Sequence, residues 1–246
     1  MKNWFSLLLT LVCAGKILAA DALADFSAAN KFYAEGKFSE AAAAYEKLLQ
    51  TGAHSPALWF NAGNAAFKAG HLGQAIANYR RAELVSPRDA ELRANLAFVR
   101  NQVPGATARE SHWQYWVGSL TLNEGTVLTL FFFWALFALL AAKQLRPVLA
   151  PKLRGLTRLV SFLTVLAGTV LALQAANHFN AAVAVITVPE AAAVSGPYDD
   201  AQTVFTVRDG AELRVLDRHD DWVEAADGHG KTGWFNNKQI AILPGA

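Results

Sequence analysis

The apolar positions are concentrated in two long runs in the middle of the chain. Residues 126–142 and 157–176 are almost entirely apolar. At about 1.5 Å per residue, each run reaches across most of a ~30 Å hydrocarbon layer. Both are apolar on every face, which is typical of transmembrane helices, with buried core helices as the alternative. Trp113, Tyr115 and Trp116 precede the first run, as in an interfacial aromatic belt. We therefore predict transmembrane helices at 126–142 and 157–176.

A third apolar run opens the chain. Lys2 precedes apolar residues 4–14, and small residues follow as far as Ala24. This order is typical of a secretory signal peptide, here 1–24, with an uncleaved anchor as the alternative. The single cysteine, Cys13, lies in this run behind Val12, where lipidation would require a small residue. One cysteine excludes an intramolecular disulfide and a thiolate zinc site.

The stretch between the two predicted spans, 143–156, is basic and carries no acidic residue. The positive-inside rule places it in the cytoplasm, so that residues 25–122 and 177–246 lie on the outer face. Binding of anionic lipid or a cytosolic partner by this loop is a further alternative. The basic side chains assigned to this loop are Lys143, Arg146, Lys152 and Arg154, together with Arg158 at the start of the second apolar run.

Residues 25–103 repeat with a period of 34. A fixed period of this length predicts stacked helical hairpins. Residues 90–100 continue the frame and then stop before Pro104-Gly105, which predicts a terminal capping helix. Residues 104–125 are expected to form a linker and interfacial segment. Positions equivalent by the period include Ala29 with Gly63, Gly36 with Gly70, Ala41 with Ala75, and Tyr45 with Tyr79.

The second unit resembles the tetratricopeptide repeat at Trp59, Gly63, Ala66, Gly70, Ala75, Tyr79, Ala82 and Pro87. This resemblance implies that a concave face binds peptides or proteins. Packing within the unit is the competing interpretation of the aromatic candidates. Capture of a C-terminal carboxylate is disfavoured, because Phe26, Glu91 and Asn95 stand where that subclass has cations. The candidate partner-binding residues are Phe26, Asn30, Phe60, Asn61, Asn64, Phe67 and Asn95.

Short strand-like segments follow the second span. After a linker at 177–190 we expect a small β-barrel at 191–246, with turns at Asp209-Gly210 and Asp227-Gly228. The series ending in Thr232-Gly233-Trp234-Phe235 resembles the bacterial SH3-like domain. Strand-like segments lie at 183–188, 202–207, 212–216, 222–226 and 232–235.

The candidate aromatics of this barrel are Trp222, Trp234 and Phe235. We expect both tryptophans in the core, with a ligand platform as the alternative. A cluster of acidic residues is expected to form a solvated face, with weak calcium binding or attraction of a basic partner as alternatives. It consists of Asp217, Asp220, Asp221, Glu224 and Asp227.

The remaining chemistry argues against an enzyme. The six histidines show no metal-ligand spacing, and the sequence contains neither a nucleophile motif nor a phosphate-binding loop. We therefore predict no cofactor and no metal. A net charge of +2 gives no global field for nucleic acid. The prediction is a multidomain α plus β membrane protein with tetratricopeptide hairpins, a two-helix transmembrane hairpin and an SH3-like β-barrel.

This order of parts is similar to the BatE type of protein from Bat or aerotolerance operons, with the closest local likeness in residues 59–65 and 90–96. The resemblance implies von Willebrand factor A domain membrane proteins and a MoxR-type ATPase as partners, in envelope stress. We expect a non-enzymatic scaffold or assembly factor at the inner membrane, with both globular domains periplasmic. The alternative is a cell-wall or envelope sensor that signals to a cytosolic partner through the basic loop.

Overall fold

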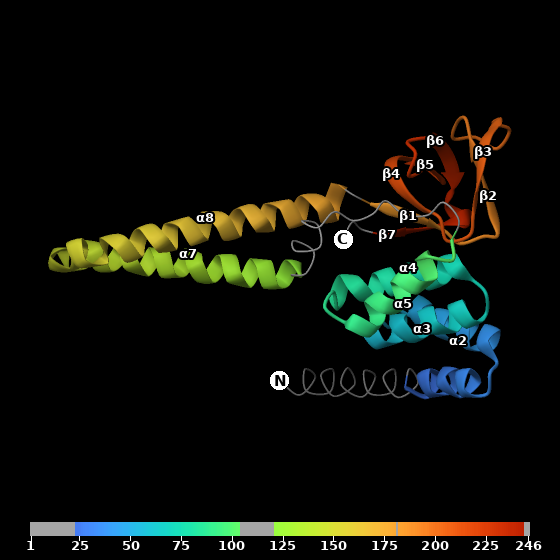
Figure 1. Cartoon of the computed structure of the whole chain (residues 1–246), viewed down its shortest axis with the longest axis horizontal. Helices are drawn as coiled ribbons and strands as arrows, with labels where there is room; N and C mark the ends of the chain where they lie inside the picture. Colours follow the sequence, from blue (N-terminus) through green and yellow to red (C-terminus); the bar gives the residue numbers. More distant parts are fainter. Residues whose placement is uncertain (1–22, 104–120, 181, 244–246) are drawn as a thin grey trace, which may run out of the picture.

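The computed structural model describes residues 23–103, 121–180 and 182–243. A helical unit, a hairpin of two long helices and a β unit are distinguished in Figure 1. The predicted signal segment through residue 22, with Cys13, lies outside the described residues, as do Trp113, Tyr115 and Trp116.

The helical unit consists of consecutive helices joined by short turns. Ser55 caps α3 by accepting a hydrogen bond from the Leu58 amide (3.1 Å), and Asp89 caps α5 through the amides of Glu91 and Leu92. The predicted capping helix at 90–100 has the bounds of α5. The helices are 23–34, α2 (Phe38–Gln50), α3 (Pro56–Lys68), α4 (Leu72–Val85) and α5 (Ala90–Arg100).

Small residues let these helices approach closely. A Cβ at Gly63 of α3 would lie 2.7 Å from the Tyr79 ring of α4, closer than side chains pack. Tyr79 and its counterpart Tyr45 are both 1% exposed and are among the largest buried side chains. Gly36 and Gly70 close their turns with φ of 75° and 86°, in the region that favours glycine. The 34-residue sequence period thus corresponds to equivalent packing positions.

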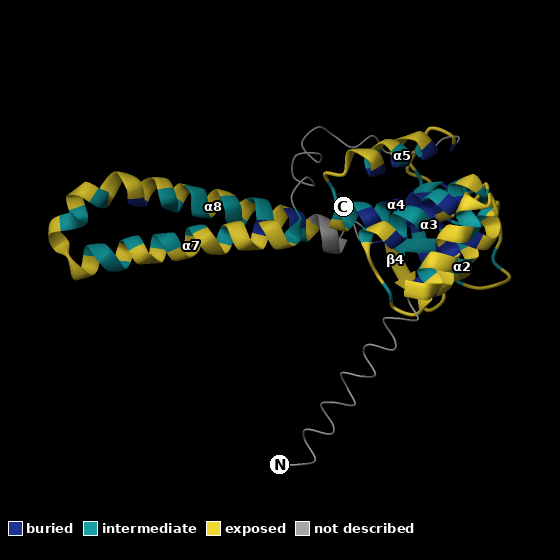
Figure 2. Ribbon diagram, turned by 90° about the horizontal axis from the view of Figure 1, so that it is seen from below, coloured by how far each residue is buried: buried dark blue, intermediate teal, exposed yellow. Residues whose placement is uncertain are grey.

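The hairpin consists of α7 (Leu122–Leu145), the short helix η1 (Pro147–Leu149) and α8 (Ala150–Asn180). Thr121 and Glu124 form a reciprocal capping box that starts α7 before the apolar run. The stretches Leu122–Leu145 and Pro147–Ala176 are both long and apolar enough to cross a membrane, with mean hydropathies of 2.2 and 2.0 over an 18-residue window of each. They are largely exposed along their length (Figure 2), unlike core helices of a soluble protein. Most of the predicted loop 143–156 is helical, since α8 begins at Ala150.

The β unit is one antiparallel sheet in the order β3-β2-β6-β5-β4-β1-β7. Two of its strands, β2 and β7, were not predicted from the sequence. Part of the expected linker 177–190 is instead the end of α8 and the strand β1, whose residues Ala184, Val185 and Ile186 are fully buried. The strands are β1 (Val183–Ile186), β2 (Glu190–Val194), β3 (Thr203–Arg208), β4 (Glu212–His219), β5 (Trp222–Ala226), β6 (Thr232–Asn236) and β7 (Ile240–Leu243).

The β unit shares a hydrophobic core with the helical unit. Val185 of β1 and Leu243 of β7 lie in one cluster with Ile76 of α4 and with Leu96 and Val99 of α5. This explains why α4 is buried on nearly every side: it packs against α3, α5 and the sheet (Figure 1). The two units therefore form a single packed body.

Candidate functional site

The predicted asparagines come together in two equivalent clusters. Tyr45 donates a hydrogen bond to Asn30 Oδ1 (2.5 Å), and Asn61 Nδ2 lies 3.5 Å from the same oxygen. In the other cluster, 34 residues further on, Tyr79 donates to Asn64 Oδ1 (2.6 Å), and Asn95 Nδ2 lies 3.3 Å from it. Burial is the main cause that raises the pKa of both tyrosines, so both hydroxyls remain donors. These asparagines link neighbouring helices while remaining accessible from solvent.

The predicted phenylalanines lie beside these clusters, half-buried. Phe26 packs on Tyr45 and Phe60 packs on Tyr79, both with ring centroids 5.9 Å apart. Phe67 meets the edge of Phe98 of α5 at 5.7 Å. Packing within the helical unit therefore buries part of each ring and leaves the rest exposed to solvent.

Phe98, which is 58% exposed, was not among the residues predicted from the sequence. The signal was available, because the 34-residue period places residue 98 at the position of Asn30 and Asn64. The third residue of this series is therefore a phenylalanine with an exposed ring, where the first two units have an asparagine. Phe26, Phe60, Phe67 and Phe98 form what we call the aromatic face of the helical unit.

The aromatic residues of the β unit divide between its two sides. Phe235 is fully buried and meets Phe205 edge-on at 6.2 Å, so it belongs to the core and not to a binding surface. Trp222 and Trp234 are half-buried and point to the opposite side from Val223, Ala225 and Phe235. The expectation that both tryptophans are core residues is wrong, because the buried positions of β5 and β6 are those that alternate with them.

Gly233 lies at a close approach between two strands of the sheet. A Cβ there would lie 2.8 Å from the Ala193 Cβ of β2, so the glycine allows two strands to approach rather than making room for Trp234.

Comparison with known families identifies this unit. Residues 187–241 match the family model of the bacterial SH3 domain. No curated protein matches the chain. The match begins after β1, so the strand that joins the hairpin to the SH3 domain, and that packs against the helical unit, lies outside the matched range.

The turn between β3 and β4 of the SH3 domain caps helix α4. Among the described residues His71 gives α4 no side-chain cap, and Asp209 accepts a hydrogen bond from the Gly73 amide instead (3.0 Å). Burial raises the pKa of Asp209, against the lowering effect of this hydrogen bond. A Cβ on Gly210 would overlap Val103 and lie 3.3 Å from Ile76. The predicted Asp209-Gly210 turn is therefore also a contact between domains.

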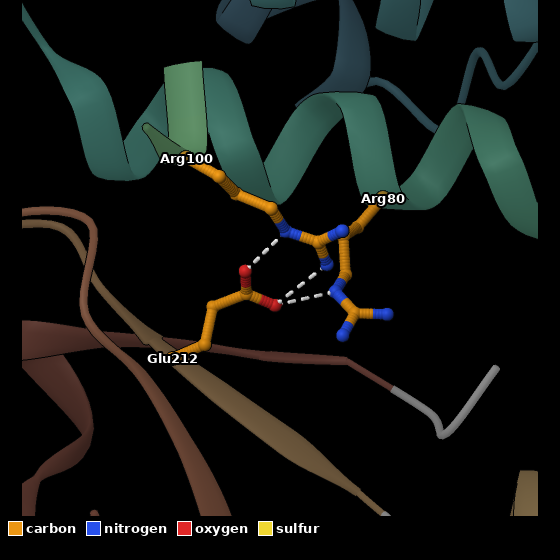
Figure 3. Close-up of polar contacts among 3 residues, drawn as sticks. All are labelled: Arg80, Arg100 and Glu212. Carbon is orange, nitrogen blue, oxygen red and sulfur yellow. Dashed lines mark hydrogen bonds and ion pairs between the residues drawn. The ribbon is translucent and has the colours of Figure 1, made fainter. Parts of the chain in front are cut away.

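A buried carboxylate completes this interface (Figure 3). Glu212 of β4 accepts from Arg80 Nε of α4 (2.7 Å) and from Arg100 Nε and Nη2 of α5 (2.6 and 3.0 Å). Its side chain is only 7% exposed. Burial by itself would raise the pKa of Glu212, but the two guanidinium groups outweigh it and hold the pKa below its ordinary value. We call the three residues the Glu212 triad.

The outward side of the SH3 domain combines tryptophan with acid. Glu224 lies opposite Trp234 on one neighbouring strand and opposite Asp217 on the other. Two like charges in cross-strand positions repel each other and attract a cation. Among the described residues, no group of three or more His, Cys, Asp or Glu side chains is placed to hold a metal ion. We call Trp222, Glu224, Trp234 and Asp217 the tryptophan face.

The basic residues predicted for the cytoplasmic loop lie at the far end of the hairpin. Lys143 is in the last turn of α7, and Arg146 ends that helix. Lys152, Arg154 and Arg158 lie in the first turns of α8 and are exposed. The basic tip is therefore the end of the hairpin most distant from both domains (Figure 1).

Proposed function

We propose that this protein is a non-enzymatic, membrane-anchored scaffold that binds protein partners on the outer face of a bacterial inner membrane. The observation that carries the proposal is the equivalence of contacts 34 residues apart: Asn30 with Tyr45, and Asn64 with Tyr79. Equivalent contacts at this spacing support a tetratricopeptide array, whose general role is to bind peptide segments or proteins.

The aromatic face is the proposed partner surface of the array. The SH3 domain packs on α4 and α5 and leaves the rings of Phe26, Phe60 and Phe67 half-exposed and Phe98 more exposed. Aromatic side chains with accessible rings are typical anchors of protein interfaces. The neighbouring asparagine amides supply hydrogen-bonding groups for the backbone of a bound segment.

The hairpin is the proposed anchor. Its two helices are apolar and largely exposed, which is favourable in lipid and unfavourable in water. Its basic tip favours a cytoplasmic position for residues 143–158 and an outer position for both domains. By resemblance to the BatE type, we propose von Willebrand factor A domain membrane proteins and a MoxR-type ATPase as partners, in assembly of an envelope-stress complex.

Site-specific photocrosslinking tests the scaffold. A photoreactive phenylalanine at Phe60 or Phe98 should crosslink to a partner protein in intact cells, whereas one at Tyr198 should not. Tyr198 is a matched control because it is an aromatic residue 57% exposed, against 58% for Phe98, and lies between β2 and β3 of the SH3 domain, outside the helical unit. Equal crosslinking at Tyr198 and Phe98 would refute binding at the aromatic face.

Reporter fusions test the anchor. A periplasm-dependent phosphatase should be active after Asn101 and Leu243 and inactive after Leu149, with the reverse for a cytoplasm-dependent fluorescent reporter. Opposite sides for Asn101 and Leu243 would refute the two-span topology.

A sensor is the second candidate, and the join between α8 and β1 favours it. α8 ends at Asn180 and β1 begins at Val183, so a displacement of the second helix would act directly on the sheet and, through Val185, on α4. Neutralising Lys152, Arg154 and Arg158 separates the candidates. A scaffold keeps its outer partners and its activity, whereas a sensor keeps its partners and loses its response.

A further inference from the structure

The turn between α4 and α5, residues 86–89, is tied to the start of the first hairpin helix. Arg88 in this turn forms an ion pair with Glu124 in the first turn of α7 (2.5 Å). A shallow pocket of about 200 Å³ separates the two segments and is lined by Val85, Ser86, Pro87, Arg88, Asp89, Thr121 and Glu124. In Figure 1 this end of the helical unit is the one that faces the base of the hairpin.

The depth of Glu124 follows from helix geometry. The centre of the apolar run 126–142 is Trp134. Half of a ~30 Å hydrocarbon layer corresponds to about ten residues at about 1.5 Å each, which places the outer boundary near Glu124. The polar layer outside this boundary is about 5–7 Å thick. A side chain paired with Glu124 therefore lies within the headgroup layer.

The surface of the turn is suited to that layer. Val85, the last residue of α4, is 51% exposed although it is apolar. Pro87 lines the same pocket, and Arg88 adds a long side chain that keeps a charged end in a polar environment beside an apolar stem. Apolar side chains together with arginine are a typical composition for contact with the membrane interface.

We propose that the α4–α5 turn binds the phospholipid headgroups of the outer leaflet, with Val85 and Pro87 entering the interface and the Arg88–Glu124 pair fixing the depth. The helical unit then rests on the membrane through this turn in addition to its covalent connection. The inference depends on the membrane anchor proposed above.

Depth-dependent quenching tests it in the full-length chain. Cys13 is replaced by serine, single cysteines are introduced as Val85→Cys, Val204→Cys and Phe133→Cys, and each is labelled with an environment-sensitive fluorophore. The proteins are reconstituted in vesicles of phosphatidylethanolamine and phosphatidylglycerol. One set of vesicles carries a nitroxide on the headgroup and another carries it deep in the acyl chain. Val204 is the matched control, being a valine 58% exposed on β3, the edge strand of the SH3 domain.

The expected result is loss of fluorescence at residue 85 with the headgroup nitroxide, no loss at residue 204, and loss at residue 133 with the deep nitroxide. Quenching at residue 133 combined with equal signals at residues 85 and 204 would overturn the headgroup contact and leave the anchor intact. Absence of deep quenching at residue 133 would overturn the anchor and the contact with it.

Discussion

Glu212→Gln removes the charge at the centre of the Glu212 triad while keeping the shape of the side chain. The exposed fractions are 7% for Glu212, 12% for Arg80 and 18% for Arg100, so the two guanidinium groups would stay in a largely dehydrated interface without their carboxylate. Breaking a buried ion pair by removal of one partner costs about 3–5 kcal/mol. The three hydrogen bonds, at 2.6 to 3.0 Å, are short enough to justify a value in that range.

The assay is hydrogen exchange of the full-length protein in detergent or nanodiscs. The triad joins the sheet to α4 and α5, so amide protection should fall at β1, β4 and α4, while α7 and α8 keep theirs. Urea unfolding monitored by tryptophan fluorescence gives the size of the effect. Glu224→Gln is the control, because Glu224 lies on the outward side of the same sheet; it should change stability by less than about 0.5 kcal/mol.

Equal effects of Glu212→Gln and Glu224→Gln would refute the reasoning. That result would mean that the domains are held together by the apolar cluster alone, with the triad as an accessory. A fall in protection confined to α7 and α8 would also contradict it, because the hydrogen bonds of the triad join β4 to α4 and α5.

Three further predictions concern pH, packing and the asparagine clusters. The pKa of Glu212 is lowered in the folded state, so its contribution to the free energy of unfolding is complete above the ordinary glutamate pKa of about 4.3 and is lost as pH falls through the lowered pKa. The stability difference between wild type and Glu212→Gln should therefore stay constant from neutral pH down to the ordinary glutamate pKa and shrink only below it. Gly63→Ala places a Cβ against the Tyr79 ring and should cost about 1–3 kcal/mol, whereas Gly228→Ala, with open space around it, should cost little when both are measured by thermal unfolding. Asn64→Ala leaves the buried Tyr79 hydroxyl without its acceptor and should cost about 1–3 kcal/mol in urea unfolding, whereas Tyr79→Phe should cost about 1 kcal/mol. A greater cost for Tyr79→Phe than for Asn64→Ala would contradict the hydrogen bond.

The helices of this protein were largely predictable because their signals are local. The 34-residue period located equivalent residues such as Tyr45 and Tyr79, and the frame gave the bounds of α5. The apolar runs located the hairpin, although α7 and α8 extend beyond them because the capping box at Thr121 and Glu124 and the turn at η1 set the helix ends.

The contact between the domains was not predictable from those signals. Asp209 and Gly210 were recognised as a turn, but their role depends on Gly73, which is more than 130 positions away in the chain. Nothing in the sequence marks Glu212, Arg80 and Arg100 as partners, because a buried ion pair between distant segments leaves no periodic pattern. Trp222 and Trp234 were misjudged for a related reason: whether a strand residue faces inward is set by register against its neighbours.

The position of the last strand has a consequence for the order in which the protein matures. Val185 and Leu243 belong to the same cluster as Ile76 and Leu96, so the helical unit is synthesised long before the residues that complete its core. Until β7 has been synthesised and has paired with β1, α4 has an uncovered apolar side. Folding of the helical unit is therefore complete only after the strands of the sheet are made, and not as the repeats leave the ribosome.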